Sequence, residues 1–141
     1  MDRLTEMWPF SKRADKPRPA NVHCDGTTAH YDTQFNKWAF RVDGIEFMFK
    51  GVQFDPVVTS WARESSATIR GLEGPLRACV MEWLKEWPCD HSRAEIVAVD
   101  LSKYTDSRTF DIAFAGDESW GDFGVNVIVK DGQIFDSYAG D

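Results

Sequence analysis

The chain has 141 residues, of which 43% are hydrophobic and 13% aromatic, so it holds enough apolar surface for one domain with a core of its own. No apolar run approaches the roughly 20 residues that span a bilayer, and no apolar segment typical of a secretory signal follows the first residues. These features exclude a membrane span and predict a cytoplasmic protein, and the net charge of −7 disfavours nucleic acid as a ligand.

Residues 1–20 combine mixed charges, prolines and no sustained apolar period. Such a composition predicts a flexible N-terminal tail. The remaining residues, 21–141, are expected to form a single α+β domain.

The first clear element is a hairpin in which residues 37–42 and 45–50 flank Asp43-Gly44. Asp-Gly between alternating apolar runs predicts a two-residue type I′ turn, because both central residues need positive φ. The resulting register pairs Val42 with Ile45, Arg41 with Glu46, Phe40 with Phe47, Ala39 with Met48 and Trp38 with Phe49. One face is then strongly apolar and the other wetter, as in an antiparallel sheet with one packed side.

Residues 55–74 are less regular and predict a loop or a short helix around residues 61–69. From Pro75 a helical period is clear, and Pro88 is expected to end it. Its apolar stripe consists of Leu76, Val80, Trp83, Leu84 and Trp87. We expect this helix to cover the apolar face of the sheet, with both tryptophans in the core.

Residues 95–101 predict another strand, with Val97, Val99 and Leu101 on one side. Residues 109–138 predict three more strands, the last two joined at Asp131-Gly132. The predicted fold class is therefore α+β, a mostly antiparallel sheet of about six strands packed on one long helix.

A regular hairpin around Asp131-Gly132 places Asp136 opposite Val127, among apolar residues that include Tyr138. A bulge or an edge position would turn this carboxylate to water. Otherwise it would be a buried partner for an arginine or an anchor in an interface.

The negative charge is concentrated in the last third of the chain. Residues 95–141 contain ten acidic and three basic side chains, a local charge of −7, so the remaining residues sum to zero. Such a field attracts basic protein surfaces and repels phosphate backbones. The alternative is that these carboxylates only keep exposed strands soluble.

The segment GDESWGD, residues 116–122, places Trp120 among acidic residues and has the composition of a protein-recognition hot spot. The alternative is that Trp120 folds back onto the sheet. The predicted partner-binding residues are Asp117, Glu118, Trp120, Asp122 and Asp136.

A metal or catalytic site is the second functional hypothesis. His23, Cys24, Cys89 and His91 are the residue types that bind zinc, but their spacing fits no compact zinc motif, and the three cysteines are expected to be free thiols. The C-terminal carboxylates could bind Ca²⁺ or transfer protons, yet they lack the EF-hand pattern. Because no nucleophile, metalloprotease or phosphate-loop motif is present, we expect a protein without enzyme activity or cofactor.

Residues 119–141, SWGDFGVNVIVKDGQIFDSYAGD, carry a W-x-x-x-G-V-x-V…DG…Y pattern. This stretch resembles the C-terminal hairpin of several small bacterial domains of unknown function, including immunity proteins found beside polymorphic toxins. The resemblance implies a non-catalytic protein that binds a toxin domain and blocks its active site. Such families share no universal binding residues to transfer.

Overall fold

The computed structural model describes residues 18–90 and 94–140. They form a single eight-stranded sheet in which the strands lie side by side in chain order. The elements are β1 (Val22–Cys24), β2 (Thr27–Asp32), β3 (Lys37–Val42), β4 (Ile45–Phe49), α2 (Val57–Gly71), α3 (Glu73–Leu84), β5 (Glu95–Asp100), β6 (Phe110–Ala115), the short 3-10 helix η3 (Glu118–Trp120), β7 (Gly124–Lys130) and β8 (Gln133–Gly140).

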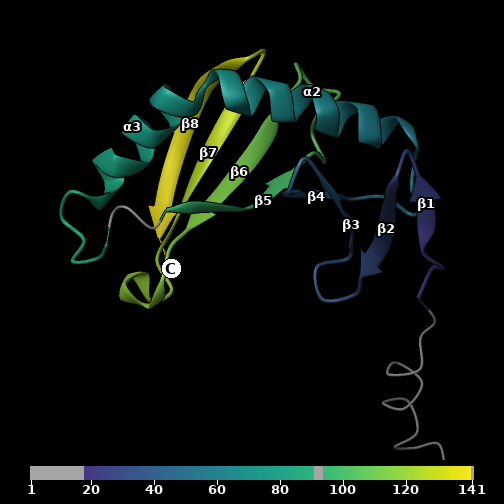
Figure 1. Ribbon diagram of the computed structural model, residues 1–141, viewed down its shortest axis with the longest axis horizontal. Coiled ribbons are helices and arrows are strands. Elements are labelled where there is room, and N and C mark those ends of the chain that lie inside the picture. The colour runs from purple at the N-terminus through teal and green to yellow at the C-terminus, as the bar shows by residue number, and fades with distance from the viewer. Residues whose placement is uncertain (1–17, 91–93, 141) are drawn as a thin grey trace, which may run out of the picture.

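The prediction of an α+β fold with a mostly antiparallel sheet is confirmed, but the numbers of strands and helices are wrong. Within residues 18–90 and 94–140 the sheet has eight strands rather than about six, and two α-helices pack on it rather than one long helix. Every pair of neighbouring strands is antiparallel except β4 and β5, which are parallel. A parallel pair needs a crossover, and α2 and α3 provide it on one face of the sheet (Figure 1).

The two strands missed by the prediction, β1 and β2, are mostly polar, and β1 is also short. Their turn is nevertheless a third Asp-Gly pair, Asp25-Gly26, and both residues have positive φ like those of the other two Asp-Gly turns. This dipeptide is the signal that could have found the hairpin. The alternation around it is weak, because Thr28 and His30 occupy the exposed face and β1 has only three residues.

Helix α2 is longer than the short helix predicted, and two of its hydroxyl side chains bind the hairpin turns instead of breaking the helix. Thr59 donates a hydrogen bond to Asp25 (2.6 Å) and Ser66 donates one to Asp43 (2.8 Å). Arg63 and Arg70, each four residues further along the helix, form ion pairs with the same two carboxylates.

The spacing of these contacts along α2 matches the distance between the two hairpins in the sheet. Seven helical residues advance about 10.5 Å, and two neighbouring hairpins repeat every two strands, or about 9.6 Å. A helix crossing the strands can therefore present the same Thr/Ser and Arg pair to the turn of each hairpin. The two hydrogen bonds, from Thr59 and Ser66, and the two arginines lower the pKa of Asp25 and of Asp43.

Helix α3 packs on the sheet through Leu76, Val80 and Leu84, which are all buried. The placement of Trp83 in the core is wrong: its side chain is 43% exposed and donates a hydrogen bond to Ser137 on β8 (3.0 Å). Trp87 lies after the helix, which ends at Leu84 before reaching Pro88, and stacks on Phe123.

The core lies between the helices and one face of the sheet. It contains Trp38, Phe40, Phe47, Val99, Leu101, Ile112, Val125, Val127 and Val129, all nearly inaccessible to solvent. The register predicted for the β3–β4 hairpin is confirmed at all five pairs.

The C-terminal hairpin follows the predicted register only next to its turn, where Lys130 pairs with Gln133 and Val129 with Ile134. A β-bulge at Phe135 then shifts the pairing by one residue, so Ile128 faces Asp136 and Asn126 faces Tyr138. Asp136 and Tyr138 therefore leave the apolar face, which corrects the regular register. Burying a carboxylate beside Val127 would be costly, and the bulge avoids this.

A second irregularity, in β5, changes which of its side chains face the core, so the predicted apolar side of this strand is partly wrong. The pairing with β6 shifts between Ile96 and Ala98, and Val97, expected beside Val99 and Leu101, is 55% exposed. Ile96 takes the core side instead, opposite Phe114. Most of the predicted tail, residues 1–17, lies outside the described residues.

Candidate partner-binding surface

The acidic loop between β6 and β7 is built around a buried tryptophan. The Trp120 side chain is 1% exposed, and its Nε1 donates a hydrogen bond to the carbonyl of Asp90 (3.1 Å). The space beside it requires glycine, because a Cβ on Gly116 would overlap the indole. Trp120 thus folds back, as the alternative interpretation has it, and offers a partner no exposed surface in this conformation.

The carboxylates of the same loop have different roles. Asp117 accepts hydrogen bonds from the backbone N–H (3.0 Å) and the hydroxyl (2.6 Å) of Ser119, and so caps η3. Glu118 and Asp122 are exposed at the end of the sheet where β6 and β7 meet. Asp136 is separated from that end by four residues of β8, or about 13 Å. The five predicted residues therefore do not form one compact site.

The face of the sheet that the helices leave uncovered carries a different set of residues. One cross-strand row on this open face runs through His30, Ala39, Met48, Asp100, Asp111, Ile128 and Asp136. The next row contains Ala98, Ala113, Asn126 and Tyr138. Figure 1 shows both helices on the opposite side of the strands.

We call the open face of β5 to β8 the acidic face. It is defined by the side chains of Asp100, Asp111, Asn126, Ile128, Asp136 and Tyr138, and polar contacts link four of them to other strands. Asp111 accepts hydrogen bonds from Asn126 (3.1 Å) and from the Tyr138 hydroxyl (3.2 Å). Asp100 pairs with Lys37, which reaches across β4. Hydrogen bonds or an ion pair therefore hold Asp100, Asp111, Asn126 and Tyr138 on this face.

The charges of the acidic face are only partly balanced. Burial acts to raise the pKa of Asp100, but hydrogen bonds from Lys37 and Ser102 outweigh it, so the pKa is lowered and the group stays ionised. Burial, and then the neighbouring Asp111 carboxylate, raise the pKa of Tyr138, which stays a neutral donor. Among the ion pairs of residues 18–90 and 94–140, none involves Asp111 or Asp136.

Of the three carboxylates on the acidic face, sequence reasoning named only Asp136 as a partner-binding residue, and the regular register placed it on the apolar face unless a bulge turned it to water. Asp100 and Asp111 lie in predicted strands where apolar and polar residues alternate, and both occupy the polar positions. This alternation could have identified them as surface residues. Their alignment in one row required the order of the strands, which depends on the parallel pairing of β4 with β5.

The residues of the metal hypothesis are dispersed. His23 contacts Thr28 (2.8 Å) at the β1 edge, whereas Cys89 follows α3 at the other end of the molecule (Figure 1). Burial, with Asp117 and Asp90 nearby, raises the pKa of the Cys89 thiol, which disfavours the thiolate that zinc would need. His91 lies outside the described residues, and within the described ones no three His, Cys, Asp or Glu side chains gather as metal ligands.

Comparison with known proteins finds no matching family model, no matching curated protein and no matching solved structure. None of the helices in the described part of the chain is long and apolar enough to cross a bilayer.

Proposed function

We propose that this protein binds another protein stoichiometrically, through its acidic face, and that the partner presents an arginine- or lysine-rich surface. The observation that carries the proposal is the row of Asp100, Asp111 and Asp136 on the face of β5, β6 and β8 that no described helix covers. Only Asp100 of the three pairs with a lysine. The exposed Tyr138 and the half-buried Ile128 add apolar surface between the charges, as protein interfaces require.

The narrower form of the proposal is an immunity protein that blocks a bacterial toxin. Toxins that attack nucleic acids need basic clefts, and an acidic, rigid sheet face is complementary to such a cleft. Glu118 and Asp122 would then extend the contact at the end of the sheet. Catalysis is not needed for this role, and cytoplasmic location remains a prediction from the sequence.

A titration can locate the surface without a known partner. We expect a nona-arginine peptide, added to the ¹⁵N-labelled protein, to shift the amide resonances of Asp111, Ile128 and Asp136 more than those on α3. Asp136→Lys should weaken binding of this peptide severalfold and flatten its dependence on salt. Glu86→Lys makes the same charge change in the turn that follows α3, where Glu86 is exposed, and serves as the matched control.

The specific partner requires a second measurement. The product of the neighbouring gene, if it is a toxin, should form a one-to-one complex that Asp136→Lys weakens and Glu86→Lys does not. Equal effects of the two variants on both the peptide and the partner would show that net charge, and not the acidic face, governs binding.

A further inference from the structure

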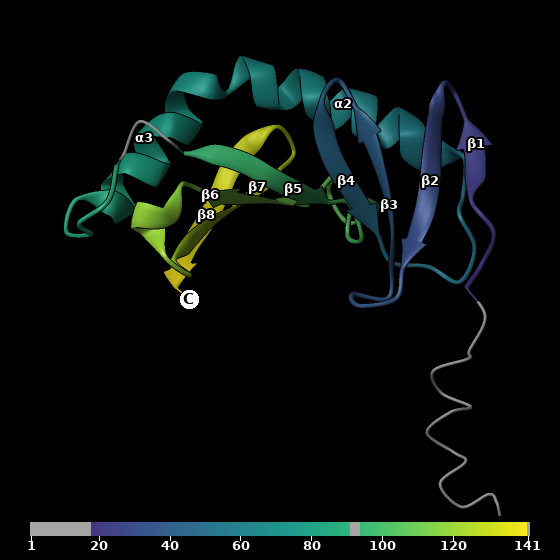
Figure 2. The same ribbon diagram turned by 60° about the horizontal axis from the view of Figure 1, so that its bottom comes forward.

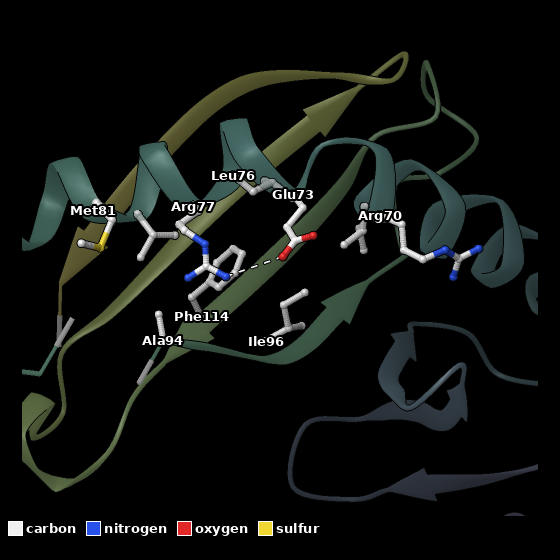
Figure 3. Close-up of a pocket in the computed structure, with 10 residues that line it drawn as sticks. Arg70, Glu73, Leu76, Arg77, Met81, Ala94, Ile96 and Phe114 are labelled. Carbon is white, nitrogen blue, oxygen red and sulfur yellow. Dashed lines mark ion pairs between the residues drawn. The ribbon is translucent and has the colours of Figure 1, made fainter. Parts of the chain in front are cut away.

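A half-open cavity of about 280 Å³ lies on the helix side of the sheet, under α3 and away from the acidic face (Figure 3). It exists because β4 and β5 pair at only two positions, Phe47 with Val99 and Met48 with Asp100. Both pairs lie at the C-terminal end of β5, and Figure 2 shows the rest of β5 turning away from β4 beneath the helices. The helices bridge this divergence and leave space below them.

The walls of the cavity are apolar. Ile69, Leu76 and Val80 line it from the helices, while Ile96 and Phe114 line it from the sheet. The three helical residues are already almost inaccessible to solvent, and the two strand residues are half-buried. Apolar walls of this kind accept a hydrocarbon chain or a small ring, and the volume is at the low end of the range for small-molecule sites.

Charged side chains are found only at the rim, and they are two arginines and one glutamate. Arg70 is directed away from the cavity, where it binds Asp43 (3.4 Å) and Ser66 (2.9 Å). Arg77 lies across the mouth with Glu73 (Figure 3), its one ion-pair partner among the described residues, at 3.6 Å. Because both side chains are more than half exposed, this pair is weak and an incoming anion can displace Glu73.

We infer that this cavity binds a small amphipathic carboxylate, with its apolar part between α3 and β5 and its carboxylate on the Arg77 guanidinium. Guanidinium and carboxylate form paired, charge-assisted hydrogen bonds, which an uncharged head group cannot match. The site is separate from the acidic face, so its test does not depend on the proposed protein partner.

Decanoate and decanol are suitable probes, because they share the same chain length and differ in charge. Both are added below the concentration at which they form micelles, and binding is followed through the methyl resonances of Leu76, Val80 and Ile96. We expect decanoate to bind one-to-one and about tenfold more tightly than decanol. Saturable shifts should be confined to residues around the cavity.

Three variants separate the contributions of Arg77 and Glu73 to binding from a general effect of charge. Arg77→Gln should weaken decanoate binding about tenfold and leave decanol binding unchanged, whereas Glu73→Gln should strengthen decanoate binding about twofold by removing the competing anion. Arg63→Gln is the matched control, because Arg63 is a similarly exposed arginine on the neighbouring helix, paired with Asp25 at 3.7 Å. The inference is overturned if decanoate shows no saturable binding, binds no better than decanol, or responds to Arg63→Gln as it does to Arg77→Gln.

Discussion

At the scale of single residues, the contact between Gly116 and Trp120 shows how closely the acidic loop is fitted. The indole occupies the position that any other side chain at residue 116 would need, and its N–H is bonded to the carbonyl of Asp90. The tryptophan cannot move aside without losing both its burial and this hydrogen bond. The loop conformation therefore depends on a glycine that no turn requires.

Gly116→Ala is expected to destabilise the protein by about 2 to 3 kcal/mol, because overpacking a rigid buried ring costs that much. The measurement is urea unfolding followed by tryptophan fluorescence. Gly74→Ala is the matched control: nothing lies near an added Cβ there, the position is helical, and the change should stabilise by up to about 1 kcal/mol. Similar effects at the two glycines would contradict the assigned packing.

At the scale of elements, α2 binds two hairpin turns at once. Thr59 and Ser66 donate to the turn aspartates, and Arg63 and Arg70 add charge. Serine and threonine normally weaken a helix interior, and for that reason the sequence predicted only a loop or a short helix here. Their partners, Asp25 and Asp43, are distant in the chain, and only the assembled sheet brings them to the helix.

These contacts predict a dependence of stability on pH. The pKa values of Asp25 and Asp43 are lowered in the folded state, so their stabilisation is present above the ordinary carboxyl pKa and is lost as the pH falls through the folded-state values. The double variant Asp25→Asn/Asp43→Asn should lose stability at pH 7 and approach the wild type below about pH 2, because asparagine suits these positive-φ turns. Urea midpoints across this pH range provide the measurement.

The control for this pair is Asp122→Asn, an exposed carboxylate away from α2, which should change the pH profile little. A constant difference between the double variant and the wild type at every pH would mean that turn geometry, and not the two charges, causes the loss.

The bulge in β8 gives a second prediction at this scale. Phe135 is the extra residue between two regular stretches of pairing, and it is 65% exposed. Deleting it should leave a regular hairpin with the same residues facing the core, at a cost of no more than about 1 kcal/mol. Deleting Ile128 from the regular strand opposite should prevent folding, because every β7 side chain on one side of the deletion would then point to the opposite face of the sheet. Circular dichroism and thermal unfolding distinguish the two results.

At the scale of the whole molecule, the sheet consists of two antiparallel halves that meet at a short parallel junction. The first half, β1 to β4, packs against α2, and the second, β5 to β8, packs against α3. The backbone joins them through two register pairs and a hydrogen bond from the Leu101 amide to the Met48 carbonyl (2.8 Å). Side chains add the Lys37–Asp100 ion pair and a hydrogen bond from the Lys50 amide to the Ser102 hydroxyl (2.9 Å). The same junction forms the cavity and determines that the acidic face lies entirely in the second half.

Native-state hydrogen exchange should therefore resolve two groups of amides, with the first half opening at lower free energy because β1 is a three-residue edge strand. Val127→Ala should lower the opening free energy of the second group alone, by about 1 to 3 kcal/mol. Phe40→Leu, in the first half, should lower the opening free energies of both groups. The first half is unfolded both in its own local opening and in the global unfolding that exposes the second half. A single opening free energy for all core amides would contradict a two-part molecule.

What the sequence determined by itself was local: two of the three Asp-Gly turns, the register of the β3–β4 hairpin, and the burial of Leu76, Val80 and Leu84 on α3. All of these depend on residues close together in the chain. The tertiary structure decided the burial of Trp120, the shift that brings Asp136 to the acidic face, and the full length of α2. These features depend on partners tens of residues away. Packing against those partners outweighs the local preferences that a sequence pattern records.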